Sequence, residues 1–148
     1  MKKVLLFAFV LFATSSLFAQ FNPVKWSYEA KWVADDEYDL VFTAHISDGW
    51  YVYSQYLESD EGPIPTSFSW ATLEGVELVG ETAEAGPRHD GYDEIFGMYV
   101  VKFSGMPTFT QRVRISGDAN VSGYLEYMTC DNDRCLPPTE IDFRFNFE

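Results

Sequence analysis

The sequence has few of the side chains on which metal sites and hydrolytic sites depend. Its 148 residues include only two cysteines and two histidines, His45 and His89. Zinc would need two ligands besides the two thiolates, and His45 falls on the outward face of a predicted strand. Residues 131–133 lack the glycine and the distal glutamate of a calcium loop. No Gly-x-Ser-x-Gly motif supports nucleophilic hydrolysis either, so we expect neither a metal nor another cofactor.

Positive charge is also scarce. The chain has 10 lysines and arginines against 23 aspartates and glutamates, which gives a formal net charge of −13. A surface this acidic repels nucleic acid and anionic lipid. An acidic balance is also common in exported proteins that bind nothing charged. The charge therefore predicts no nucleic-acid partner and does not identify another one.

Long apolar runs are confined to the N-terminus. Lys2 and Lys3 precede an apolar run at residues 4–13 and small residues up to Ala19, the pattern of a secretory signal peptide. No later stretch approaches the roughly 18 to 20 apolar residues that a transmembrane helix needs. We expect residues 1–19 to be removed before Gln20. Residues 20–148 then form one exported domain without membrane insertion, in a compartment where disulfides persist.

No segment shows a helical period, whereas apolar and polar residues alternate along most of the chain. The clearest case is residues 141–147, where Asp142, Arg144 and Asn146 separate apolar side chains. This period of two indicates strands with one buried face. We predict strands at residues 26–32, 38–46, 66–72, 75–79, 98–103, 109–115, 121–129 and 141–147. Short strands with Gly, Pro, Asp and Asn between them predict an all-β, immunoglobulin-like antiparallel β-sandwich.

Two stretches interrupt this regular pattern. Residues 53–65 read as an irregular connection, because Pro63 and Pro65 cannot donate ladder hydrogen bonds. Residues 80–97 read as a loop that is long for a compact domain, and loops of that length are usually functional or disordered. This loop ends in Asp-Glu-Ile-Phe-Gly at residues 93–97, where the apolar side chains would be exposed unless they cover something.

The two cysteines, Cys130 and Cys135, lie five positions apart and are followed by two prolines. If the residues between them fold back as a tight turn, the two thiols come within bonding reach. A disulfide that closes so short a loop gives only roughly 2 kcal/mol of stability in the chain-entropy model. The spacing therefore favours redox chemistry over stapling, although an ordinary stabilising disulfide remains an open alternative.

Three stretches together resemble the N-terminal periplasmic domain of the DsbD thiol:disulfide interchange proteins, also described as a disulfide bond corrector module. Residues 127–138 read Tyr-x-x-Cys, a short acidic turn, and then Cys-Leu-Pro-Pro. Residues 48–53 read Asp-Gly-Trp-Tyr-Val-Tyr and are similar to another family segment, and residues 93–97 are similar to the family's cap loop. The three matches occur in the family's order and frame nearly all of residues 21–148.

The resemblance implies an immunoglobulin-like sandwich whose cysteine pair cycles between disulfide and dithiol. It implies that Cys135 forms the mixed disulfide with partners and that Cys130 resolves it. It also implies electron transfer to or from periplasmic thioredoxin-fold proteins, with a membrane protein as electron donor. Neither a transmembrane conduit nor a thioredoxin-like module occurs before Glu148, so we expect a stand-alone protein with a separate membrane donor.

The resemblance further implies a cap over the cysteine pair. The cap loop maps to Asp93, Glu94, Ile95, Phe96 and Gly97. An aromatic of this loop shields the pair in the family, but Ile95 aligns with it here and Phe96 follows, so either is a candidate. The family's site-lining tyrosines match Tyr51 and Tyr53.

A different class of function stays open at this point. A β-sandwich that binds glycan or peptide, or serves in adhesion, would carry the same composition and keep an inert structural disulfide. Trp50 and Tyr56, if exposed, would then stack on the ligand. A degenerate relative that serves only as a scaffold is a third reading.

Overall fold

The computed structural model describes residues 21–148, so the predicted signal peptide at residues 1–19 lies outside the described residues. The ordered elements of this part are all strands, as predicted. They are β1 (Val24–Ala34), β2 (Glu37–Ile46), β3 (Tyr51–Tyr53), β4 (Ser67–Ala85), β5 (Arg88–Asp93), β6 (Met98–Phe103), β7 (Thr108–Tyr127), β8 (Thr129–Cys130) and β9 (Thr139–Phe147). Over residues 21–148, no helix has the length and apolar character needed to cross a membrane.

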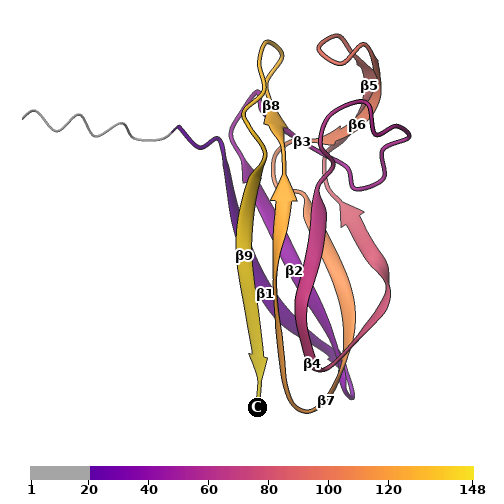
Figure 1. Ribbon diagram of the computed structural model, residues 1–148, viewed down its shortest axis with the longest axis vertical. Coiled ribbons are helices and arrows are strands. Elements are labelled where there is room, and N and C mark those ends of the chain that lie inside the picture. Colours follow the sequence, from indigo (N-terminus) through magenta and orange to yellow (C-terminus); the bar gives the residue numbers. More distant parts are fainter. Residues whose placement is uncertain (1–20) are drawn as a thin grey trace, which may run out of the picture.

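The strands form two antiparallel sheets. The larger sheet has the order β1-β2-β7-β4, with β9 also paired to β7, and the smaller one has the order β5-β6-β3-β8. Figure 1 shows the long strands of the larger sheet running along the molecule, with the smaller sheet at its upper end. The fold is therefore an immunoglobulin-like β-sandwich, with the cysteine-bearing strand β8 at one end.

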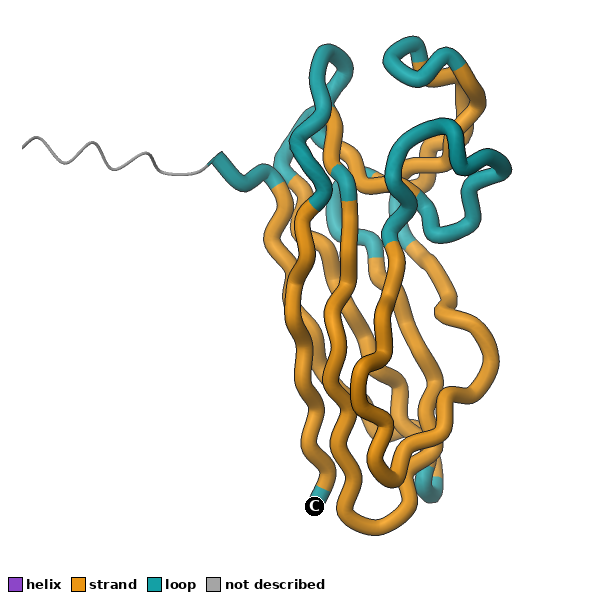
Figure 2. Tube along the Cα trace, in the orientation of Figure 1, coloured by secondary structure: helices purple, strands orange, loops and turns teal. Residues whose placement is uncertain are grey.

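The larger sheet supplies both layers of the sandwich, because β4 and β7 fold over at the lower end (Figures 1 and 2). Gly75 of β4 and Gly117 of β7 both have positive φ there, at 64° and 66°, a conformation that glycine adopts without steric cost. The first half of β7 pairs with β2 and its second half pairs with β9. The separate strands predicted at 66–72 and 75–79 are the two limbs of β4.

The core lies between these layers, and Phe42 of β2 is near its centre. The Phe42 ring lies 4.9 Å from that of Phe143 and 4.8 Å from that of Phe68, so the two layers meet through aromatic contacts. In β9, Phe143 and Phe145 are buried and their polar neighbours are exposed, as the alternation predicts. The buried core also includes Leu40, Ala44, Phe109, Val113, Val121 and Leu125.

One sequence prediction about the chain's layout is wrong. Residues 80–97 are not a long loop, because β4 continues to Ala85 and β5 pairs with β6 along its whole length. Gly86, with φ of 140°, and Pro87 form the tight turn between them. Strand β5 is an edge strand rich in charged residues, so its sequence lacks the alternation that marks a half-buried strand. The irregular connection predicted at 53–65 is confirmed.

Candidate redox site

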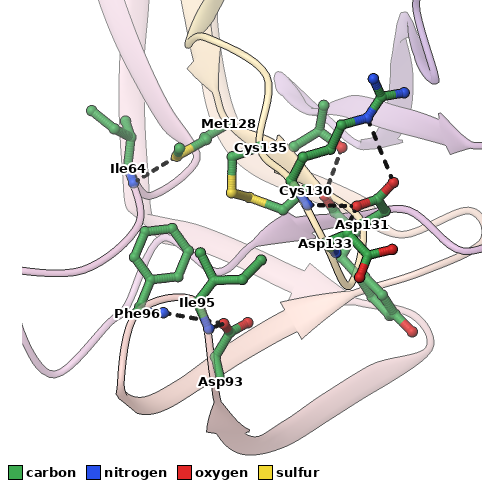
Figure 3. Close-up of a disulfide and its surroundings, with 12 residues drawn as sticks. Ile64, Asp93, Ile95, Phe96, Met128, Cys130, Asp131, Asp133 and Cys135 are labelled. Atoms are coloured by element: carbon green, nitrogen blue, oxygen red, sulfur yellow. Dashed lines mark hydrogen bonds and ion pairs between the residues drawn. A yellow bond between two sulfur atoms is a disulfide. The ribbon is translucent and has the colours of Figure 1, made fainter.

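The two cysteines face each other across a tight hairpin at the end of β8. The amide of Asp131 donates to the carbonyl of Arg134 at 3.0 Å, and the amide of Leu136 donates to that of Thr129 at 2.9 Å. Between these two hydrogen bonds, Cys130 and Cys135 form an antiparallel β-bridge as a non-hydrogen-bonded pair. Side chains of such a pair lie closer together than those of a hydrogen-bonded pair. Their Cα atoms are 4.0 Å apart and the sulfurs form a disulfide (Figure 3). The predicted turn is thus confirmed.

The turn of this hairpin is held by Asp131. Its Oδ1 accepts the amides of Asp133 and Arg134, both at 2.8 Å. These two backbone hydrogen bonds favour the charged carboxylate and lower the pKa of Asp131 below its usual range. The Arg134 side chain connects the hairpin to the sandwich, because its guanidinium lies 5.5 Å from the centre of the Trp50 ring, within the range of a cation–π contact. The hairpin is therefore fixed both from within and against the sandwich.

The depressed pKa of Asp131 makes a testable contribution to stability. A carboxylate whose pKa is lower in the folded state stabilises the fold above its unfolded pKa of about 3.9, and this contribution is lost as pH falls through the folded pKa. We expect Asp131→Asn, which keeps an acceptor oxygen but loses the charge, to be less stable than the wild type at pH 6. Urea unfolding at stepwise lower pH should show this difference shrinking below pH 4. A difference in unfolding free energy that does not change with pH would contradict the contribution of the Asp131 charge.

The two cysteines differ in exposure. Cys130 is 1% exposed and belongs to a small buried cluster with Tyr53 and Val100, whereas Cys135 lies at the margin of that cluster and is partly exposed. This difference bears on thiol–disulfide exchange, because the rate of exchange depends on which sulfur an incoming thiolate can reach.

The site occupies one face of the smaller sheet. Tyr51 of β3 is paired with Cys130 of β8, and Tyr53 is paired with Lys102 of β6. Since side chains two residues apart share a face, Tyr51, Tyr53, Lys102 and Cys130 lie on the same side of this sheet. The ammonium of Lys102 lies 4.4 Å from the centre of the Tyr51 ring, within the range of a cation–π contact.

Tyr53 is the most enclosed side chain of this face. It is completely buried, and its hydroxyl has no hydrogen-bond partner among the described residues. Burial, and then the negative charge of Asp93, raise the pKa of Tyr53. The phenol therefore stays neutral beside the disulfide.

The cap is the turn between β5 and β6. Asp93 organises it, because its Oδ1 accepts the amides of Ile95 at 2.9 Å and Phe96 at 3.4 Å. Its carbonyl accepts the amide of Gly97 at 2.8 Å. Its Oδ2 lies 3.0 Å from the ammonium of Lys102, and the Asp93 side chain is only 5% exposed. Glu94 is exposed.

Ile95 and Phe96 differ in their contacts. The Phe96 ring packs edge-on against Tyr53, with 5.8 Å between ring centres, and it joins the cluster that contains Cys130, Cys135 and Met128 (Figure 3). Ile95 is 42% exposed. The structure therefore brings Phe96 into the cluster with the disulfide, and leaves much of Ile95 in solvent.

Sequence reasoning missed Lys102 and two methionines of this cluster, Met98 and Met128. The Met128 sulfur accepts the amide of Ile64 at 3.4 Å, which ties the irregular 54–66 connection to the strand that precedes Cys130. Lys102 had a detectable signal, because it is the one charged residue in the otherwise apolar strand 98–103. The methionines had none, since they read as ordinary core residues.

Of the two aromatic residues that would bind a ligand in a glycan- or peptide-binding module, only Tyr56 is exposed to solvent. Trp50, expected to be exposed in that reading, is only 6% exposed and lies 5.5 Å from the ring of Phe21. Tyr56 is exposed, but its hydroxyl donates to the carbonyl of Thr82 at 2.6 Å. The expectation for Trp50 is wrong because its apolar ring completes the end of the core.

The histidines are occupied elsewhere. His45 hydrogen-bonds the Ser27 hydroxyl at 2.9 Å and His89 hydrogen-bonds that of Ser104 at 2.8 Å. Within residues 21–148, no three His, Cys, Asp or Glu side chains are grouped so that they would hold a metal ion. The site is thus built from sulfur, aromatic rings and two ion pairs, Lys102–Asp93 and Arg134–Asp131.

These features define a class: an immunoglobulin-like β-sandwich with a disulfide hairpin at one end, in a cluster that also contains Phe96 of the β5–β6 turn. The sequence model of the family described as "Thiol:disulfide interchange protein DsbD, N-terminal" matches residues 19–146, and the chain belongs to this family. The resemblance found in the sequence is thereby confirmed. No curated protein matches the chain.

Two solved structures share the fold. The reduced DsbD N-terminal domain of Neisseria meningitidis is 20% identical, with a TM-score of 0.53 over 82% of this chain and 85% of that one. The N-terminal periplasmic domain of ScsB from Proteus mirabilis is 15% identical, with a TM-score of 0.58 over 86% of this chain. The match spans 47% of the ScsB chain. Identities this low show the fold and carry no residue roles.

Proposed function

We propose that this protein carries out thiol–disulfide exchange in the periplasm through Cys130 and Cys135. The observation that carries the proposal is a disulfide between a buried and a partly exposed cysteine, in one cluster with Phe96 of the β5–β6 turn, in a chain of this family. The matched ScsB domain is described as periplasmic. Export by the predicted signal peptide would bring this chain to the same compartment.

The chemistry divides between the two sulfurs according to their exposure. In the oxidised protein, a donor thiolate attacks Sγ of Cys135, the S–S bond breaks, and Cys130 leaves as a thiolate that takes up a proton. A second donor thiolate then releases Cys135, so that two electrons and two protons have entered. In the next half-cycle the Cys135 thiolate attacks the disulfide of an acceptor. Cys130 then attacks Sγ of Cys135, which releases the acceptor reduced.

The partners that fit this chemistry are proteins with an exposed redox-active cysteine pair. The family supports thioredoxin-fold proteins of the periplasm in that role, and we propose a membrane protein as the electron donor. The activity would then be that of a protein-disulfide reductase, with no cofactor besides the cysteines. Residues 20–148 would form the exchange domain.

The reduction potential tests this proposal. We expect a potential near −230 mV or higher when the protein is equilibrated with glutathione buffers, because exchange couples lie in that range. The measurement is the fraction of alkylated thiols at each glutathione ratio. A potential well below about −300 mV would mark a structural bond and overturn the proposal.

Phe96 is the residue that we expect to shield the disulfide. Its ring is held in the cluster with Tyr53 and Cys130, so Phe96→Ala should weaken the closed cap and raise the rate of reduction about tenfold, which corresponds to about 1.4 kcal/mol in activation free energy. The measurement is the second-order rate with dithiothreitol, a thiol too small to depend on partner recognition.

The matched control is Ile95→Ala in the same turn. Because the Ile95 side chain is largely in solvent, its truncation should change this rate by less than about twofold. A larger acceleration for Ile95→Ala than for Phe96→Ala would exchange the two roles.

A further inference from the structure

Lys102 of β6 links the cap turn to strand β3, which pairs with Cys130, through an ion pair and a cation–π contact. Its ammonium lies 3.0 Å from Oδ2 of Asp93 and 4.4 Å from the centre of the Tyr51 ring. Tyr51 is the register partner of Cys130. Lys102 therefore stands between the acid that organises the cap and the residue opposite the buried cysteine.

Asp93 uses its two carboxylate oxygens for different tasks. Oδ1 accepts the amides of Ile95 and Phe96 and so shapes the turn, whereas Oδ2 is left for Lys102. Both partners are shielded, with the Asp93 side chain 5% and the Lys102 side chain 20% exposed. A charge pair in such a place is weakly screened by salt, and removal of one partner leaves the other buried without a counter-charge.

We propose that Lys102 is a positioning residue that holds the cap closed over the disulfide by neutralising Asp93. With the pair intact, the turn keeps Phe96 in the cluster with Cys130. Without the ammonium, the Asp93 carboxylate gains free energy by moving into water, and it carries the turn and Phe96 with it. This inference deepens the proposed exchange function, because it identifies what sets access to the sulfurs.

The test uses the oxidised protein and dithiothreitol, so it needs no protein partner. Lys102→Met keeps the length and apolar stem of the side chain and removes only the charge. We expect it to raise the rate of disulfide reduction at least tenfold. Lys25→Met, on an exposed position of β1, removes the same charge away from the site and should leave the rate unchanged.

A second variant separates positioning from general destabilisation. Asp93→Asn in the Lys102→Met background keeps an acceptor for the amides of Ile95 and Phe96 and leaves no unpaired charge. We expect the double variant to return to within about threefold of the wild-type rate. Near-UV circular dichroism and thermal unfolding establish that each variant is folded.

Two results would overturn the inference. One is a wild-type rate for Lys102→Met, and the other is a double variant that stays as fast as Lys102→Met. Neither result bears on the reduction potential. The role of Lys102 can therefore fail while the exchange function stands. A reduction potential in the range of structural disulfides would remove the exchange function while the effect of Lys102 on the reduction rate stays measurable.

Discussion

Replacement of Cys130 by serine should turn the protein into a trap for its redox partners. The remaining thiol, Cys135, is the partly exposed one, and it would attack the disulfide of an oxidised thioredoxin-fold protein. Because no second sulfur is then present to resolve the product, the mixed disulfide should accumulate. Non-reducing electrophoresis and mass spectrometry would locate the new bond at Cys135.

Cys135→Ser is the matched comparison. Its remaining thiol, Cys130, is 1% exposed and lies within the cluster beneath the cap, so we expect at least tenfold less mixed disulfide in the same time. Both single variants should lose turnover down to the uncatalysed rate, while both stay folded, since the short disulfide loop contributes only about 2 kcal/mol. Equal trapping by the two variants would contradict the assigned roles.

Gly123→Ala should destabilise the fold more than replacement of either cysteine. Gly123 lies in the second half of β7, between Trp70 of β4 and Phe143 of β9, opposite a bulge in β4. A Cβ atom at this position would overlap the backbone carbonyl oxygen of Ser69 and crowd the Phe143 ring. Backbone cannot rotate away as a side chain does, so the strands must separate. We expect a loss of about 3 kcal/mol or more in the free energy of unfolding.

Gly91→Ala is the control for this substitution. Gly91 lies in β5, where an added Cβ meets nothing within 4 Å and the backbone is not in the left-handed region. Its replacement should be neutral or stabilise the protein by about 0.5 kcal/mol, because alanine restricts the unfolded chain. Urea unfolding of the two variants gives the comparison. A loss at position 123 no greater than at position 91 would show that the strands accommodate the methyl group.

Alternation alone was enough to place most of the sandwich. Strands with one buried face, such as β2 and β9, repeat apolar residues at every second position, and both lie where the pattern predicts them. Strand β5 was not predicted, because its charged residues and Gly91 do not alternate with apolar residues. An edge strand needs only one neighbour to satisfy its backbone, so its side chains are less constrained.

The site was predictable to the extent that its parts are local. The Cys130–Cys135 hairpin follows from spacing and turn residues, which act over a few positions. The contact between Phe96 and Tyr53 does not, because a turn residue can point to either side and the choice depends on packing across the sheet. The ion pair between Lys102 and Asp93 could not be predicted for the same reason, because it joins two strands. The sequence shows only that Lys102 is a charged residue among apolar ones.

The place of β9 in the sandwich has a consequence for the order in which the protein folds. This strand follows the cysteines along the chain, yet its Phe143 and Phe145 complete the core by packing on Phe42 of an early strand. The sandwich therefore cannot close until the C-terminal strand has been synthesised, after both cysteines. Until that strand is in place the core beneath the smaller sheet is incomplete, so we expect the unequal burial of Cys130 and Cys135 to be established only late in folding.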